Sequence, residues 1–172
     1  MGNILIFNFQ FSNAMIQRLQ SIFLLLASGS IASLFSPMMA LGKVVHGQAA
    51  APSPLADGQF TVSDDVSLMG LAAVAAVVFF VAIFLFKNRS VQATVTQIGN
   101  LLSGGLLAYG YFLFSKAIPS VSAETIDATS QATEIGYSFG IGAPIFAMAL
   151  SLIAIRMIRK DEAIVRSADR LR

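Results

Sequence analysis

Few side chains in this sequence are of the types that carry acid–base, nucleophilic or metal chemistry. The chain has one histidine, His46, and no cysteine among its 172 residues. A site built from several histidine or thiolate ligands of one chain is therefore excluded, and so are disulfides and a cysteine nucleophile. His46 follows Lys43 in a polar stretch, and we interpret it as an exposed loop residue. We predict no catalytic residue, no metal site and no cofactor.

Two acidic pairs are the remaining candidates for ion binding. Asp64 and Asp65 are adjacent, and Glu124 lies three residues before Asp127. Carboxylate oxygens are ligands that Ca²⁺ and Mg²⁺ prefer, but acidic loops also arise from charge asymmetry across a membrane, and we favour that second interpretation. The sequence has no phosphate-binding loop, metalloprotease motif or nucleophile elbow. It therefore does not predict an enzyme.

Four long apolar runs are the elements that would position these residues. Apolar residues make up 56% of the chain, charged residues only 12%, and the mean hydropathy is +0.75. The runs cover residues 19–41, 68–86, 98–118 and 137–155. At about 1.5 Å per residue, such lengths match a hydrocarbon core of about 30 Å. Because a helix satisfies its own backbone groups in lipid, we predict an all-α fold, an integral membrane bundle of four transmembrane helices.

The chain divides into three predicted regions. Residues 1–14 form an N-terminal tail, residues 15–158 a transmembrane domain, and residues 159–172 a basic cytoplasmic helical tail. The first region has no charged side chain, and translation from Met1 and from Met15 both stay open. A signal peptide cleaved near residues 49–51 is a further alternative, which would leave three spans. The first run exceeds the about 7–15 residues of an ordinary signal sequence, so we favour a retained first helix.

The distribution of lysine and arginine predicts the orientation. With the N-terminus inside the cell, nine of the eleven basic residues are cytoplasmic, and only Lys43 and Lys116 lie outside. Basic residues near the ends of spans resist translocation. We therefore predict that both termini are cytoplasmic.

Polar and small residues inside the spans are candidates for helix packing. Asn100 is the most polar side chain well inside a run, and we expect it to hydrogen-bond to a neighbouring helix. We expect Pro119 to end the third helix and Pro144 to kink the fourth. Small residues at four-residue spacing let helices approach closely, and they are Gly104 and Ala108 on the third helix and Gly136, Gly140 and Pro144 on the fourth.

The basic C-terminal tail is the most distinctive surface element. It is expected to continue the fourth helix into the cytoplasm, against the anionic lipids of the inner leaflet. Interleaved acids and a lack of stacking aromatics argue against nucleic-acid binding. Its basic residues are Arg156, Arg159, Lys160, Arg166, Arg170 and Arg172.

The two ends of the chain carry a family resemblance. Residues 15–27 (MIQRLQSIFLLLA) and 158–172 (IRKDEAIVRSADRLR) resemble the ends of a bacterial domain-of-unknown-function family of small four-helix inner-membrane proteins. The resemblance covers residues 15–172 and implies a bacterial origin, a retained first helix and a start at Met15. It implies no catalytic residue.

Two functions fit these predictions. We favour a multi-pass protein of the bacterial inner membrane that is not an enzyme and packs, as an accessory or scaffold subunit, against other membrane-protein subunits or against itself. The alternative is a small oligomeric transporter or channel, with Asn100, Ser103 and the kink at Pro144 lining a path.

Overall fold

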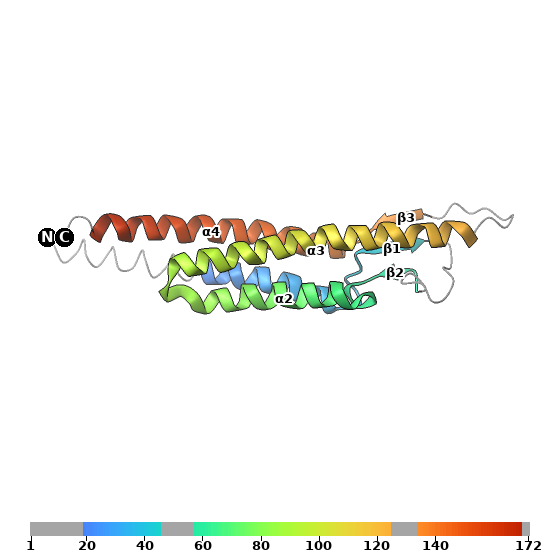
Figure 1. Ribbon diagram of the computed structural model, residues 1–172, viewed down its shortest axis with the longest axis horizontal. Coiled ribbons are helices and arrows are strands. Elements are labelled where there is room, and N and C mark those ends of the chain that lie inside the picture. Colours follow the sequence, from blue (N-terminus) through green and yellow to red (C-terminus); the bar gives the residue numbers. More distant parts are fainter. Residues whose placement is uncertain (1–18, 46–56, 125–133, 170–172) are drawn as a thin grey trace.

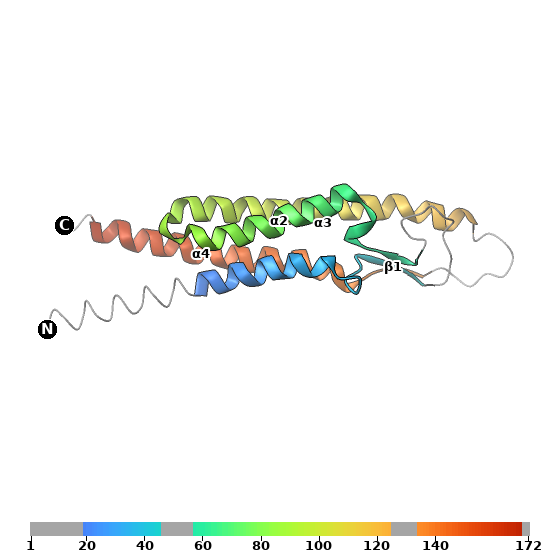
Figure 2. The same cartoon turned by 90° about the horizontal axis from the view of Figure 1, so that it is seen from below.

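Four helices lie along one long axis (Figures 1 and 2). The computed structural model describes residues 19–45, 57–124 and 134–169, most of which are helical. The helices are the N-terminal helix (residues 19–32), α2 (Val66–Phe84), α3 (Arg89–Glu124) and α4 (Gly142–Asp169). The α2–α3 turn and the last turns of α4 lie at one end, here called the turn end. Three short strands lie at the other, the sheet end (Figure 1).

Each helix buries one narrow stripe of side chains that recur at intervals of three and four residues. This spacing is typical of helices that pack lengthwise at shallow crossing angles. Many of the buried residues are small, so the helix backbones approach closely. The stripes are Gln20, Leu24, Ala27, Ile31 and Leu34 in the first helical segment, Leu68, Ala72, Ala75, Phe79 and Ala82 on α2, Gln92, Thr96, Gly99, Ser103, Leu106 and Gly110 on α3, and Ala143, Ala147, Leu150, Ala154, Ile158 and Asp161 on α4.

The helices form an up-and-down bundle in which neighbours in sequence are neighbours in space. α3 packs against both α2 and α4. The N-terminal helix closes the ring through two serine hydroxyls. Ser28 donates to the carbonyl of Ala76 on α2 at 3.0 Å, and Ser30 donates to the carbonyl of Ala143 on α4 at 2.8 Å. This connectivity is that of a simple four-helix bundle.

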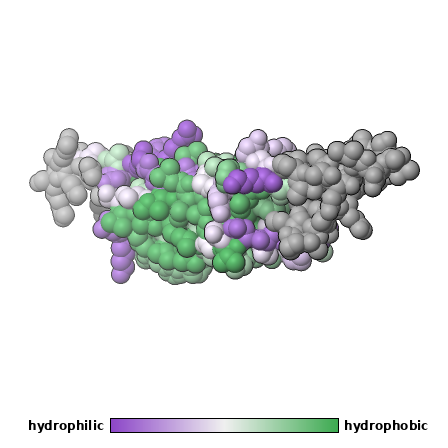
Figure 3. All heavy atoms as spheres, turned by 45° about the vertical axis from the view of Figure 1, so that its right-hand side comes forward, coloured by the Kyte–Doolittle hydropathy of each residue, from purple (hydrophilic) through white to green (hydrophobic). Residues whose placement is uncertain are grey.

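Three helical segments are long and apolar enough to cross a membrane. They are Val66–Lys87, Arg89–Ala117 and Phe139–Ala163, while the apolar helix Leu19–Phe35 is shorter within the described residues. The face shown in Figure 3 carries a broad hydrophobic area, with hydrophilic residues mostly at its margins. Four helices are therefore present as predicted, and three of them have the length that the hydrocarbon core requires.

The first helix is shorter than the predicted span of residues 19–41. A 3₁₀ turn (Ser33–Phe35) ends it, and Ser36 is extended with a ψ of 134°. Ser36 precedes Pro37, whose ring disfavours the helical conformation in the residue before it. The prediction that helix continues to residue 41 is wrong, because residues 36–41 lead into the sheet instead.

The third helix extends beyond its predicted apolar run, residues 98–118, at both ends. α3 begins at Arg89, directly after a 3₁₀ turn (Leu85–Lys87) that follows α2, and runs to Glu124. Pro119 therefore lies inside α3, and the prediction that it ends the helix is wrong. A proline within a helix removes one N–H donor at a cost of about 3 kcal/mol, and here the regular backbone continues past it. At 36 residues, α3 is about 54 Å long, and it extends beyond α2 beside the strands (Figure 1).

A small antiparallel sheet joins the two connections at the sheet end, so the fold is not purely all-α. Its strands are β1 (Gly42–Val45), β2 (Gln59–Phe60) and β3 (Glu134–Tyr137), in the order β2-β1-β3. The sequence did not predict the sheet, because strands of two to four residues are too short to display a two-residue hydrophobic period. The central strand β1 ties the first connection to the last.

One side of the sheet packs against α3 through aromatic rings. The register places Phe60, Gly42 and Tyr137 in one row across the three strands. Phe114 of α3 lies over this row, with ring centroids 5.8 Å from Phe60 and 5.9 Å from Tyr137. A Cβ atom at Gly42 would overlap the Phe114 ring. Glycine is therefore required at the centre of the row, where it makes room for the ring.

Candidate functional sites

Asn100 and Ser151 form a polar contact between α3 and α4. The Ser151 hydroxyl donates to Asn100 Oδ1 at 2.9 Å and also lies 2.8 Å from the carbonyl of Met148. Ser151 is fully buried and Asn100 partly so. The contact lies between helices that pack closely, and its geometry is that of a packing interaction.

The other small residues predicted on α3 face in different directions. Gly104 lies towards α4, where an added Cβ would be 3.8 Å from Met148 Cε, an ordinary contact. Ala108 is exposed, so it does not belong to the core of the bundle. Gly99 is the glycine on α3 that a close approach requires, because a Cβ there would lie 2.8 Å from the Phe79 ring. The sequence pattern did not single out Gly99.

The predicted row Gly136, Gly140 and Pro144 does not lie on one helix. Gly136 belongs to β3, Gly140 to a 3₁₀ turn (Phe139–Ile141), and only Pro144 to α4. The kink expected at Pro144 is also wrong, because Pro144 lies in the first turn of α4, where a missing N–H costs little.

Gly140 is required for a different reason from the one predicted. Its N–H donates to the carbonyl of Ala40 at 2.9 Å, and an added Cβ would overlap that same carbonyl oxygen. Gly140 therefore permits the close crossing of two backbones at the sheet end, whereas nothing lies within 4 Å of a Cβ built on Gly136.

The basic tail is partly described. α4 continues without a break to Asp169 and extends past the α2–α3 turn (Figure 1). Arg156, Arg159 and Lys160 are exposed on it. The Arg166 side chain, together with Arg170 and Arg172, lies outside the described residues, as do His46, Asp127 and residues 1–14.

The acidic pair Asp64 and Asp65 caps helix starts. Asp64 Oδ2 accepts from the backbone N–H of Thr61 at 2.6 Å, and Asp65 Oδ1 accepts from the N–H of Leu68 at 2.8 Å. Such side chains satisfy N–H groups that the first helical turn leaves free. Within the ranges that the structure describes, no group of three or more histidine, cysteine or acidic residues is arranged to hold a metal ion.

A buried ion pair at the turn end was not predicted. Arg89, the first residue of α3, places its Nε atom 3.1 Å from Asp161 Oδ2 on α4, and its Nη1 atom donates to the Asp161 carbonyl at 3.3 Å. The Asp161 side chain is 0% exposed and that of Arg89 is 20% exposed. Neither carboxylate oxygen accepts a well-directed hydrogen bond, so the contact is chiefly one of charge.

Gln92 extends this polar contact to α2. Its Nε2 atom donates to the carbonyl of Ala82 at 3.0 Å, and its side chain is buried. Ala82 lies in the last turn of α2, and its carbonyl also accepts from the backbone N–H of Leu85. Arg89, Gln92 and Asp161 therefore join the turn end of three helices.

An apolar cavity of about 360 Å³ lies near the sheet end. One wall comes from α3 and consists of Leu106, Leu107, Gly110, Tyr111 and Phe114. The opposite wall comes from the two connections and the start of α4, and consists of Leu41, Tyr137, Ile141 and Pro144. No sequence pattern indicated the cavity, because its walls meet only once the sheet has formed.

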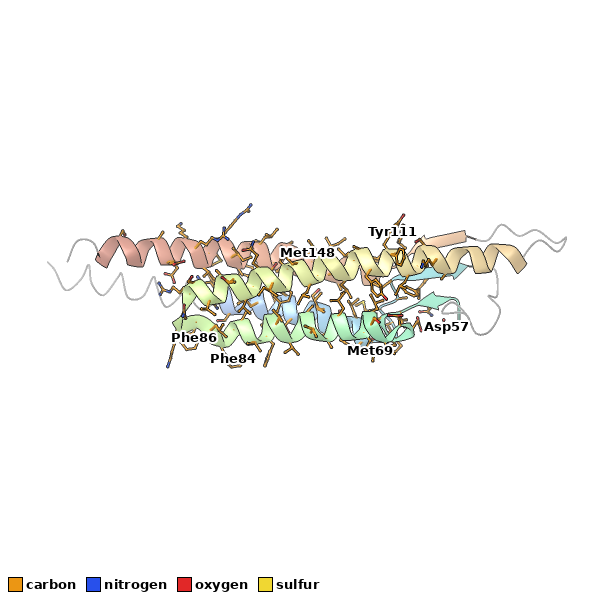
Figure 4. All side chains as sticks on the ribbon, viewed as in Figure 1. Asp57, Met69, Phe84, Phe86, Tyr111 and Met148 are labelled. Carbon is orange, nitrogen blue, oxygen red and sulfur yellow. The ribbon has the colours of Figure 1, made fainter. Side chains whose placement is uncertain are left out.

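Exposed aromatic side chains mark both ends of the apolar region. Phe84 and Phe86 lie at the turn end and Tyr111 near the sheet end (Figure 4). All three are exposed, as are Phe139 and the cavity-lining Tyr137. Tryptophan and tyrosine are the aromatic residues enriched where a spanning segment meets the interface, so of these five residues Tyr111 and Tyr137 fit such a position.

These features define the class of the protein as a helical bundle in which three helices are long and apolar enough to span a membrane. Residues 16–171 match the model of the family described as domain of unknown function (DUF4293). The match covers nearly the whole chain, so the chain belongs to this family, and the resemblance seen at its two ends is confirmed. No curated protein matches the chain. The bacterial origin and the inner-membrane location stay predictions.

Proposed function

We propose that this chain is a non-enzymatic multi-pass protein of the bacterial inner membrane that serves as an accessory or scaffold subunit for other membrane proteins. One observation carries the proposal. On α3, Gly105 and Ala108 are exposed between the larger exposed side chains Leu101 and Phe112. A shallow apolar face with small residues at its centre lets a second helix approach closely. This face, defined by these four residues, is here called the α3 outer face.

The internal contacts of the bundle favour this function over transport. The hydroxyls of Ser28, Ser30 and Ser151 all donate to groups within the bundle. Thr96 and Ser103 donate to carbonyls one turn earlier in α3. Polar groups that transport solutes or protons usually face a water-filled path, whereas these serve helix packing.

The charge distribution supports an orientation with both termini in the cytoplasm. Lys87, Arg89 and the exposed Arg156, Arg159 and Lys160 belong to the turn end, while Lys43 and Lys116 belong to the sheet end. The turn end is therefore the more basic one, as expected for a cytoplasmic side. Its arginines would face the anionic lipids of the inner leaflet.

The α3 outer face can be tested with two matched glycine variants. Gly105→Phe fills the face, while Gly70→Phe adds the same ring at an exposed glycine of α2, and a Cβ at either position has nothing within 4 Å. Each full-length chain would be extracted from native membranes in a mild detergent and weighed by native mass spectrometry. We expect a stable complex with another membrane protein for the unmodified chain and Gly70→Phe, and its loss for Gly105→Phe.

Other outcomes of this experiment contradict the proposal in distinct ways. A homo-oligomer that moves solute across reconstituted vesicles would favour the small transporter or channel. Chemical turnover by the isolated chain would favour an enzyme. Equal loss of the complex in both glycine variants would show that the α3 outer face is not the contact surface.

A further inference from the structure

A positive charge lies at each end of the α3 outer face. Lys116 is exposed four residues beyond Phe112, on the same side of α3, and its ammonium group lies 4.4 Å from the centroid of the Phe112 ring. Arg159 of α4 reaches the other end, where its Nη2 atom donates to Oε1 of the exposed Gln97 at 3.4 Å. Between these two contacts, residues 98–112 include no charged side chain.

Neither cation has an acidic partner within the part of the chain that the structure describes. The salt bridge found there joins Arg89 to Asp161 instead. Lys116 contacts an aromatic ring and Arg159 contacts an amide oxygen, and both of these groups are neutral. Each contact places a cation beside the outer face and leaves its charge unneutralised. An occupant with carboxylates at the matching positions would therefore complement the face.

The separation of the two charges distinguishes a spanning helix from a lipid. Phe112 lies 15 residues after Gln97, so the two charges are about 22 Å apart along α3 at about 1.5 Å per residue. The acyl chains of a lipid cover one leaflet, which is about half of a core that is about 30 Å thick. A lipid headgroup can therefore meet only one of the two cations. A single occupant that meets both must cross the membrane.

A second copy of this chain does not complement the face. Copies inserted in the same orientation would pair about a two-fold axis along the membrane normal. Pairing through the α3 outer face would then place each of the two cations beside its own counterpart. Like charges opposite each other oppose association, so the complementary partner is a different chain.

We propose that the α3 outer face binds a transmembrane helix of a different protein, apolar along its span, with a carboxylate opposite Lys116 at one end and another opposite Arg159 at the other. The inference rests on the proposed function and specifies the chemistry of the partner. Gly105 and Ala108 let the partner helix approach closely, and the two charges fix its register along α3. Each exposed ion pair should strengthen binding by a factor of about two to five.

Two synthetic peptides can test this charge requirement. Both are membrane-spanning peptides of leucine and alanine with an acceptor fluorophore, one with glutamate at each end and the other with glutamine at each end. The full chain has no native cysteine, so it carries a donor fluorophore at Ser90→Cys and is reconstituted in phosphatidylcholine vesicles. We expect the glutamate peptide to reach half-maximal energy transfer at a mole fraction about four- to 25-fold lower than the glutamine peptide.

Matched variants assign this preference to the two cations. Lys116→Gln combined with Arg159→Gln should make the two peptides bind equally. Lys43→Gln combined with Lys87→Gln also removes one exposed cation from each end of the bundle, and this variant should keep the preference. Gly105→Phe should weaken the binding of both peptides. Circular dichroism of each variant checks that the helices are intact.

The possible results separate this inference from the proposed function. Equal binding of the two peptides to the unmodified chain, with Gly105→Phe still weakening both, would refute the charged partner and leave the α3 outer face as a contact surface. A preference that survives the loss of Lys116 and Arg159 would refute these cations as its source. Unchanged binding of both peptides to Gly105→Phe would refute the face itself, and with it the proposed function.

Two further results would also overturn the inference. If phosphatidylglycerol, in place of part of the phosphatidylcholine, displaced the glutamate peptide, anionic lipid would be the occupant instead. Failure of the glutamate peptide to bind at all would refute the charged partner, whereas the glycine variants in native membranes report on the proposed function separately.

Discussion

Replacing Arg89 by leucine should destabilise the bundle more than replacing its partner Asp161 by the same residue. In Arg89→Leu, the Asp161 carboxylate stays at a position where its side chain is 0% exposed, without its positive partner. In Asp161→Leu, the guanidinium stays at a position that is 20% exposed and can still donate to the backbone carbonyl of residue 161 at 3.3 Å. The two changes remove the same contact but leave different unpaired charges.

The expected magnitudes follow from that difference. Removing one partner of a buried ion pair costs about 3–5 kcal/mol when the other charge cannot reach water, which is the case for Arg89→Leu. For Asp161→Leu we expect a loss of about 1–2 kcal/mol, because the remaining charge is partly solvated and partly hydrogen-bonded. The double variant leaves no unpaired charge, so it should regain about 2 kcal/mol relative to Arg89→Leu alone.

The free energy of unfolding can be measured on the purified chain in mixed micelles. Unfolding by increasing mole fractions of SDS would be followed by circular dichroism of the helices. Arg159→Leu is the matched control, because the Arg159 guanidinium is exposed and makes a long contact of 3.4 Å with Gln97 Oε1. We expect that control to change the free energy of unfolding by no more than about 0.5 kcal/mol.

The outcome that would refute this reasoning is a strictly additive double variant. Additivity would mean that Arg89 and Asp161 do not interact, and that the turn end is held by apolar packing alone. Equal losses in the two single variants would instead refute the difference in burial on which the asymmetry rests.

Three further predictions concern other parts of the bundle. Gly140→Ala should lower the free energy of unfolding by about 2–4 kcal/mol, because the added Cβ would overlap a backbone oxygen. The control Gly136→Ala should unfold on heating at the same temperature as the unmodified chain. Ser151→Ala should cost about 0.6 kcal/mol in the same SDS titration, and a loss above about 2 kcal/mol would contradict a simple packing role. Because the chain has no native cysteine, Asp57→Cys should react with an impermeant maleimide in intact cells and Ser90→Cys only after permeabilisation. The opposite labelling would show that the orientation in the membrane is the reverse of the one proposed.

The sequence predicted the helices because their apolar runs exceed what a soluble core could bury. It did not predict their buried faces. On α3 that face includes Gln92, Thr96 and Ser103, which hydropathy alone assigns to a polar surface. Their burial is possible because Thr96 and Ser103 donate to carbonyls of their own helix at 2.8 and 3.0 Å, and Gln92 donates to α2. The intervals of four and seven residues between them were the signal that the sequence contained.

The candidate sites were less predictable than the helices. The sequence indicated that Asn100 would contact another helix, but Arg89 and Asp161 are 72 residues apart, and hydrophobic patterning does not fix how far one helix slides along another. The same limit applies to Gly140, whose partner is a backbone carbonyl in the first connection. Such contacts depend on the register between elements, which only the packed structure specifies.

The central position of β1 constrains the order in which the chain can assemble during synthesis. β1 pairs on one edge with β2 and on the other with β3, and about 90 residues separate β1 from β3 in the chain. At about 5–20 residues per second, a ribosome needs roughly 4–18 s to supply them. Over that interval one edge of β1 lacks its partner, and an unpaired edge is a template for wrong pairing. Nascent chains released before Glu134 should therefore be those that cellular quality control removes, which pulse-chase degradation of truncated chains would measure.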